Sequence, residues 1–285
     1  MASLFPSGPP LPAFQSLLIK GPYHPSAPIH LALSHAATFP ATSSQAATRI
    51  LLITPSRETI AAALREHNDD WIGTHSGRGD VLQLSACTTV FYPASAAHFS
   101  FLVEMLTTAT DARRNNATTI LEQAPSLVVL IGLSAYFLED VEMNPTGHPW
   151  TVSSYMTLVA RSLASFAALR GTSDIALALF DSKLDDLKLP ILKHPTGAKK
   201  PSKLENVAFY VQKYFDLLAV FEEDDEFFLN SSQEDENEMD SQRRNRMHIF
   251  RRGQNKAFET RRWIERIDSH GGTVFVWDEI NSESF

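Results

Sequence analysis

Three runs of aliphatic residues place the strongest limit on how this chain can fold. The runs are RILLIT (residues 49–54), LVVLIG (residues 127–132) and DIALALFD (residues 174–181). None alternates apolar with polar residues, and a continuous run of this length is typical of a strand buried on both faces. Helix-forming segments at residues 57–67, 96–109 and 153–170 separate the runs. This alternation predicts an α/β domain with a mostly parallel central sheet and helices on both faces.

The two ends of the chain extend this pattern in different ways. Towards the N-terminus we expect a strand at residues 14–19, a helix at 29–39 and short strands at 82–84 and 89–92. The last third contains four apolar segments without helices between them, at residues 209–221, 247–252, 261–267 and 273–280. Gly271 and Gly272 mark a hairpin turn between the last two. These segments predict antiparallel C-terminal strands that extend the main sheet.

Length and composition indicate one intracellular domain. The 285 residues, 44% of them hydrophobic, are enough to bury a full core. Residues 1–12 are rich in Pro, Ser and Gly, which predicts a disordered tail before a single domain at residues 13–285. The single cysteine, Cys87, excludes an internal disulfide and a cysteine-rich metal site. We expect no secretory signal and no membrane, because no run approaches the roughly 20 apolar residues of a membrane span.

The charge is divided into blocks, so the net charge of −8 describes neither block. Residues 222–240 contain ten acidic residues and no basic ones, and without them the net charge is +2. Residues 243–266 contain nine Lys and Arg against two Glu. The composition predicts an acidic disordered insertion at about 222–246.

The segment after the first expected strand has the layout of a phosphate-binding loop without its chemistry. Such a loop has the pattern G-x-x-x-x-G-K-[ST], in which the lysine neutralises phosphates and the hydroxyl holds Mg²⁺. In GPYHPSAPIHLALSHAA, Gly21 aligns with the first glycine, and Ser26, Ala27 and Pro28 replace the glycine, lysine and hydroxyl. The acidic residue that ends a second strand is replaced by Ile131. Both halves of the expected nucleotide site therefore lack the residues that bind phosphate and magnesium.

With these segments in this order, the chain resembles the RecA-like recombinase family, and within it the divergent, ATPase-dead paralogues of the Shu-complex type. The resemblance rests on the loop and first helix, on RILLITPS, on PSLVVLIGLSAYF and on DIALALFD. It implies a RecA-like P-loop NTPase core that has lost catalysis and needs no cofactor. It also implies a nuclear accessory subunit in homologous-recombination DNA repair, bound to another recombinase paralogue or Shu-type subunit. The alternative is an ordinary strand-to-loop turn in another α/β protein.

Two basic segments predict contacts to single-stranded DNA. The first follows DIALALFD, where the resemblance places a DNA-binding loop, and contains Lys183, Lys188, Lys193, Lys199, Lys200 and Lys203. The second contains Arg243, Arg244, Arg246, Arg251 and Arg252, with Phe250, Phe258 and Trp263 as candidate stacking residues. Two alternatives remain: Phe258 and Trp263 face the core, or the arginines pair with the acidic run and are masked by it. Near the N-terminus, Leu4, Phe5 and Phe14 form a candidate tether for a neighbouring subunit.

An enzyme is the rival function. Ser134, in GLSAY after an expected strand, partly matches the nucleophile elbow of hydrolases, although Tyr136 replaces the final glycine. Asp181 ends another expected strand, and His194 lies in the lysine-rich segment. These groups would suit a hydrolase or transferase of unknown substrate. The histidine spacing matches no metal-binding motif.

Overall fold

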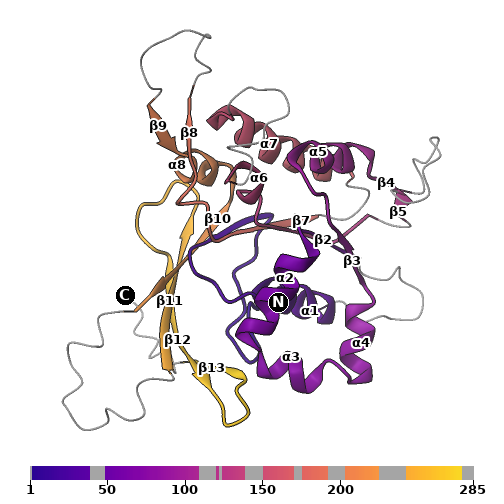
Figure 1. Cartoon of the computed structure of the whole chain (residues 1–285), viewed down its shortest axis with the longest axis vertical. Helices are drawn as coiled ribbons and strands as arrows, with labels where there is room; N and C mark the ends of the chain where they lie inside the picture. The colour runs from indigo at the N-terminus through magenta and orange to yellow at the C-terminus, as the bar shows by residue number, and fades with distance from the viewer. Residues whose placement is uncertain are drawn as a thin grey trace.

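The chain forms a nine-stranded sheet with helices on both faces (Figure 1). The structure, a computed structural model, describes residues 2–38, 49–108, 120–121, 124–138, 150–169, 175–191, 203–224 and 242–277. The strand order is β13-β12-β11-β10-β1-β7-β6-β2-β3. The expected α/β class, with a mostly parallel sheet and antiparallel C-terminal strands, is confirmed.

Six neighbouring strands of this sheet are parallel. They are β1 (Ser16–Lys20), β2 (Ile50–Ile53), β3 (Thr88–Phe91), β6 (Leu127–Ile131), β7 (Ala176–Asp181) and β10 (Leu217–Glu223). All four residues of β2 and the first four of β1 and β6 are buried, as the aliphatic runs predict. Strands β1 and β2 are separated by β7 and β6. They are neighbours in both common doubly wound orders, so this sheet has neither order.

The antiparallel extension consists of β11 (Gln242–Arg251), β12 (Glu259–Ile267) and β13 (Thr273–Trp277). The expected hairpin at Gly271 and Gly272 joins the last two, and Gly271 has a φ of 77°. The boundaries expected for the acidic insertion, 222–246, are wrong at both ends. Strand β10 continues to Glu223 and β11 begins at Gln242, because acidic side chains of β10 pair with arginines of β11 across the two strands. The remainder of the acidic run, 225–241, lies outside the described residues.

Helices cover both faces of the parallel strands. One face carries α1 (Ala27–Ala37) and α4 (Gly79–Ser85), with α2 (Arg57–His67) and α3 (Asp70–His75) between them in the chain. The other carries α5 (Ala96–Met105), α6 (Ala135–Leu138), α7 (Val152–Ala168) and α8 (Ala208–Val211). The remaining elements are the 3₁₀ helix η1 (Gln212–Tyr214) and the strands β4 (Thr107–Thr108), β5 (Ile120–Leu121), β8 (Lys188–Pro190) and β9 (Leu204–Asn206). Across the described ranges, no helix is both long and apolar enough to span a bilayer.

Two strand predictions were wrong because short helices occupy the segments. Residues 82–84 lie in α4, where Val81 and Leu84 pack on the core with the three-residue spacing of a helix. Residues 208–214 form α8 and η1, which bury Ala208 and Val211, again three apart. In both cases the three-residue spacing of buried residues distinguishes a helix from a strand. The number of apolar residues alone does not distinguish them.

The N-terminal residues are packed and do not form the disordered tail expected at 1–12. The side chains of Leu4, Phe5 and Leu11 are 3%, 1% and 3% exposed. The Phe5 ring stacks on Phe275 of β13 with ring centroids 4.3 Å apart and lies 5.6 Å from Trp263 of β12. These residues cover apolar side chains on one face of the antiparallel extension.

The expected tether for a neighbouring subunit is therefore occupied within the chain. Leu4 and Phe5 are buried, and the half-buried Phe14 packs against the same core. Arg261 of β12 adds a polar clamp, because its Nη1 and Nη2 donate to the carbonyls of Pro9 and Pro10 at 2.9 and 2.7 Å. The segment behaves as part of the domain.

We predict that Phe5→Ala lowers the free energy of unfolding by about 3–5 kcal/mol, the usual cost of removing a buried aromatic ring. Phe101→Ala is the matched control, since Phe101 on α5 is 64% exposed and its loss should cost less than about 0.5 kcal/mol. Urea denaturation of both variants measures the difference. Equal stability of Phe5→Ala and the unmodified chain would show that the segment is not part of the core.

Candidate functional site

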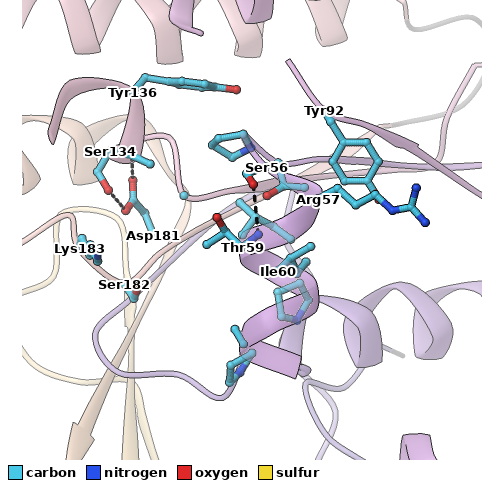
Figure 2. Close-up of a pocket in the computed structure, with 18 of the residues that line it drawn as sticks. Ser56, Arg57, Thr59, Ile60, Tyr92, Ser134, Tyr136, Asp181, Ser182 and Lys183 are labelled. Atoms are coloured by element: carbon cyan, nitrogen blue, oxygen red, sulfur yellow. Dashed lines mark hydrogen bonds between the residues drawn. The ribbon is translucent and has the colours of Figure 1, made fainter. Parts of the chain in front are cut away.

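A cavity of about 790 Å³ opens at the carboxyl edge of the parallel strands (Figure 2). Its walls come from the loops that follow β1, β2, β3, β6 and β7, including Tyr23, Ser56, Tyr92, Ser134 and Lys183. The neighbouring strands β1 and β7 lead to helices on opposite faces of the sheet, α1 and α8, so the cavity spans a topological switch point. Open α/β sheets bind ligands in such crevices, and this volume suits a small molecule.

Gly21, the first residue of the loop after β1, is required by a close backbone approach. It has a φ of +88°, in the left-handed region that favours glycine. A Cβ at this position would lie 2.1 Å from the carbonyl oxygen of Phe221 in β10. The packing of β1 against β10 therefore explains this glycine without any bound phosphate.

The backbone N–H groups of the loop are largely used within the loop. Tyr23 N donates to the Gly21 carbonyl at 2.9 Å, and Ala27 N donates to the His24 carbonyl at 2.9 Å. Ser26 N donates to Nδ1 of His24 at 3.3 Å. Three further positions, 22, 25 and 28, are prolines and have no N–H. Six of the eight positions from 21 to 28 thus offer no N–H to a phosphate.

The loop also lacks a cation at neutral pH. His24 is its one titratable side chain that can carry a positive charge, and burial lowers the pKa of His24 to about 4. The ring is therefore neutral, which suits its role as acceptor for Ser26 N. Ser26, at the place of the second glycine, is fully buried, with Oγ 2.7 Å from Nδ1 of His24.

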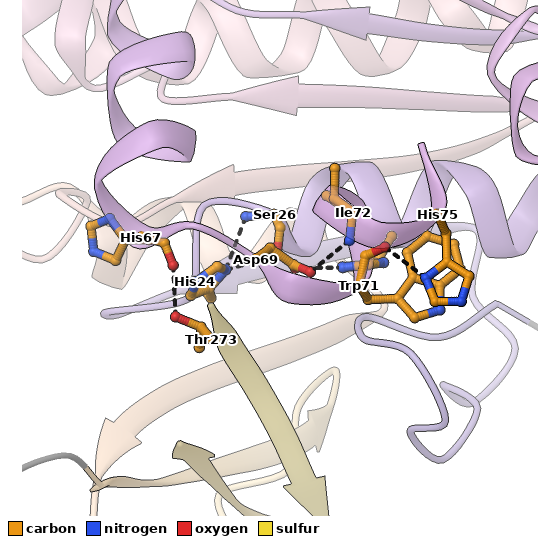
Figure 3. Close-up of polar contacts among 9 residues, drawn as sticks. His24, Ser26, His67, Asp69, Trp71, Ile72, His75 and Thr273 are labelled. Carbon is orange, nitrogen blue, oxygen red and sulfur yellow. Dashed lines mark hydrogen bonds and ion pairs between the residues drawn. The ribbon is translucent and has the colours of Figure 1, made fainter. Parts of the chain in front are cut away.

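A buried polar cluster ties this loop to α3 (Figure 3). His30 of α1 lies with Nε2 2.7 Å from Oδ2 of Asp69, and Asp69 caps α3 by accepting from Ile72 N at 3.0 Å. Burial raises the pKa of Asp69, but hydrogen bonds from His30, Ser26 and Ile72 together with the charge of His30 outweigh it and leave the pKa below its usual value. The polar groups beside the loop hold helices together.

Ile131 and the loop line the same cavity, as the resemblance requires. Ile131 ends β6 and pairs in register with Phe180 of β7, and Pro25 and Pro28 line the cavity as well. Two segments about 100 residues apart in sequence, expected to form one nucleotide site, therefore line one cavity. Their aligned positions hold Ala27, Pro28 and Ile131 in place of the lysine, the hydroxyl and the carboxylate.

Asp181, next along β7, is the carboxylate closest to replacing the missing acid, but its oxygens are occupied. It is fully buried and accepts from Ser134 N at 2.8 Å, from Ser134 Oγ at 2.5 Å and from the Tyr155 hydroxyl at 3.0 Å. Burial raises the pKa of Asp181, although these hydrogen bonds oppose the rise. Its contacts fasten the end of β7 to the start of α6 and to α7.

The same contacts place Ser134 in a structural role. Nucleophile elbows hold their serine in a strained backbone conformation, yet among the described non-glycine residues only Ser7 and Asn68 have positive φ. The Ser134 hydroxyl donates to Asp181, and the described lining of the cavity includes no histidine to act as its base. His194, the other candidate, lies outside the described residues.

Sequence reasoning missed several polar side chains of the cavity. Among them are Arg57, the first residue of α2, and Tyr92, just after β3. Their position after parallel strands was the available signal, because the carboxyl ends of parallel strands share one edge.

The predicted lysines separate into two regions. Lys183 lines the cavity, whereas Lys188 on β8 and Lys203 beside β9 lie exposed on a neighbouring hairpin. Lys203 Nζ lies 2.7 Å from Oε1 of Glu205. The other three, Lys193, Lys199 and Lys200, lie outside the described residues.

Two of the five predicted arginines pair with the start of the acidic run, as one alternative proposed. Arg243 pairs with Glu223, and Arg246 lies 3.0 Å from Glu222. Asp224 lies 3.2 Å from Arg262 of the next strand. Arg244 lies on the same strand, β11. The masking hypothesis therefore has a structural basis at residues 222–224.

The aromatic residues of this segment behave differently from one another. Trp263 is 1% exposed, which confirms that it faces the core. Phe258 is 50% exposed, so the same expectation was wrong for it, because it precedes β12 and lies outside the alternation of the strand. The guanidinium carbon of Arg251 lies 4.2 Å from the centre of the Phe258 ring, and Arg252 is exposed beside it.

Comparison of the sequence with protein-family models and with curated proteins finds no match. In the described part of the chain, no group of three or more His, Cys, Asp or Glu side chains is arranged to hold a metal ion. The resemblance to RecA-like recombinases therefore stays a prediction.

We predict that Gly21→Ala destabilises the fold by roughly 2–4 kcal/mol, because the added Cβ meets the Phe221 carbonyl at a left-handed φ. Gly132→Ala is the matched control. Gly132 has a similar φ of 65° but open space around its Cβ, so its cost should be only about 1–2 kcal/mol. Chemical denaturation compares the two, and equal costs would refute the packing explanation.

Proposed function

We propose that this chain is a non-catalytic, RecA-like accessory subunit of homologous-recombination DNA repair. It acts in the nucleus without a cofactor, assembles with another recombinase paralogue or Shu-type subunit, and binds single-stranded DNA. One observation carries the proposal: Pro25, Pro28 and Ile131 meet in a single cavity at the switch point of the sheet. These are the places of the phosphate loop and of the acidic strand end in the family that the chain resembles.

The chemistry of the cavity supports a subunit that does not hydrolyse ATP. A triphosphate with Mg²⁺ needs backbone donors, a cation and an open carboxylate. The loop uses most of its N–H groups internally and its histidine is neutral, so the cations of the cavity, Arg57 and Lys183, lie outside the loop. Asp181 already accepts three hydrogen bonds from the protein. The residues that stand in place of the nucleotide-binding groups contribute to packing or to internal hydrogen bonds. The fold therefore persists as a scaffold without the nucleotide chemistry.

The basic side chains support a sequence-independent contact to DNA. The described lysines of the β8–β9 hairpin, the arginines on β11, and Arg262 and Arg266 on β12 are exposed or half-buried. Lys and Arg at such positions neutralise phosphates and release counterions, without reading bases. The N-terminal apolar residues are already packed in the chain, so the partner subunit is expected to bind another surface.

We predict that Mg²⁺ and ATP leave the melting temperature unchanged, because stabilisation requires a ligand that binds the folded state. A fluorescent single-stranded oligonucleotide should bind at low salt, with log K falling by about 0.7 per neutralised phosphate for each unit of log salt. Thermal shift and anisotropy measure the two effects. Stabilisation by ATP that depends on Mg²⁺, or a lack of DNA binding at 50 mM salt, would overturn the proposal.

Masking by the acidic run generates a second prediction. Glu222→Gln combined with Asp224→Asn removes two carboxylate charges beside Arg246 and Arg262 and should raise the affinity for single-stranded DNA several-fold at low salt. The gain should disappear at high salt, where the charges are screened.

The matched control for masking is Glu104→Gln combined with Asp80→Asn. It removes the same charge and frees Arg161 and Arg78, two arginines elsewhere on the surface. An equal gain in this control would show that net charge, and no local masking, controls the affinity.

A further inference from the structure

Beside the β8–β9 hairpin, aromatic rings and ammonium groups share an exposed surface. It is formed by Lys203, Phe209, Tyr210, Lys213 and Tyr214, here called the α8 surface. The side chains of Phe209 and Tyr214 are 58% and 45% exposed. Neighbouring Ala208 and Val211 are buried against the core, so one side of α8 anchors the segment and the other presents the rings.

The lysines of this surface lie on or beside the rings. Lys213 Nζ lies 4.1 Å from the centre of the Phe209 ring and 5.7 Å from that of Tyr210. The Phe209 and Tyr210 rings meet edge to face, with centroids 5.4 Å apart. Lys203, next to β9, lies 2.7 Å from Oε1 of Glu205, and this hydrogen bond and charge raise the pKa of Lys203. Cation–π geometry of this kind orients both partners.

We propose that the α8 surface is a stacking platform for the bases of single-stranded nucleic acid, an inference that rests on the proposed DNA-binding function. Unstacked bases bind exposed aromatic rings irrespective of sequence, and nearby ammonium groups hold the phosphates. A duplex hides the faces of its bases, so the platform selects single strands.

The lysines also distinguish this occupant from a protein partner. The cores of protein interfaces are depleted in lysine, whereas here Lys213 lies directly on the ring of Phe209. The surface thus presents flat aromatic rings with a positive charge directly on one of them.

The test uses the full chain and a single-stranded oligonucleotide that carries 2-aminopurine, whose fluorescence is quenched by stacking. Phe209→Ala combined with Tyr214→Ala should weaken binding at least about tenfold and abolish the added quenching, since each stacked base contributes about 1–3 kcal/mol. The salt dependence should not change, because no phosphate contact is lost. Lys213→Gln should instead reduce the salt slope by about one neutralised phosphate.

Three further variants make the result decisive. Phe101→Ala removes an equally exposed ring from α5 and should leave binding unchanged. Phe209→Leu with Tyr214→Leu keeps apolar bulk but should bind as weakly as the alanine pair. Phe209→Trp with Tyr214→Phe keeps both rings and should retain binding. Thermal melting confirms that each variant is folded.

The outcomes separate this inference from the function on which it rests. If the unmodified chain binds no single-stranded DNA, the proposed function fails, and the platform with it. If it binds and the alanine pair retains both affinity and quenching, the platform alone is wrong. A change in oligomeric state by sedimentation, with unchanged DNA affinity, would identify the surface as a protein-docking site and overturn the inference.

Discussion

Burial of both faces of the parallel strands is the constraint on which the rest of this structure depends. Strands such as β2 and β6 expose almost nothing, so helices must cover them on each side. Successive loops converge at the carboxyl edge of the parallel strands, and there the cavity opens. N-terminal residues, Phe5 foremost, pack on the apolar side chains of the antiparallel extension.

At that cavity, internal hydrogen bonds occupy groups that a phosphate would require. A backbone N–H that donates to its own loop is not available to a ligand, and a carboxylate with three donors has little need of a cation. Ser26 and His24 form hydrogen bonds with each other, and Asp181 accepts one from the backbone N–H of Ser134. A site with this bonding gains rigidity while it loses the capacity to hold a triphosphate, which is the physical basis of a scaffold role.

On the charged strands too, bonds within the protein compete with bonds to a ligand. Paired acidic and basic residues on β10, β11 and β12 neutralise one another at the surface, where such pairs are weak and sensitive to salt. A polyanion that offers many phosphates can compete with them. The rings and lysines of the α8 surface differ, because a cation on an aromatic face leaves its charge available to solvent.

The sequence by itself determined the strand and helix alternation and the chemistry missing at Ala27, Pro28 and Ile131. Both follow from side-chain type and local spacing, which need no knowledge of the fold. Only the tertiary structure decided that Phe5 is buried in the core and that Gly21 is required by the close approach of the Phe221 carbonyl. It also decided that Ser134 donates a hydrogen bond to Asp181 and that Glu222 forms an ion pair with Arg246. These outcomes depend on contacts between residues up to about 270 positions apart, such as Phe5 with Phe275. Strand order brings such pairs together, and no local pattern encodes it.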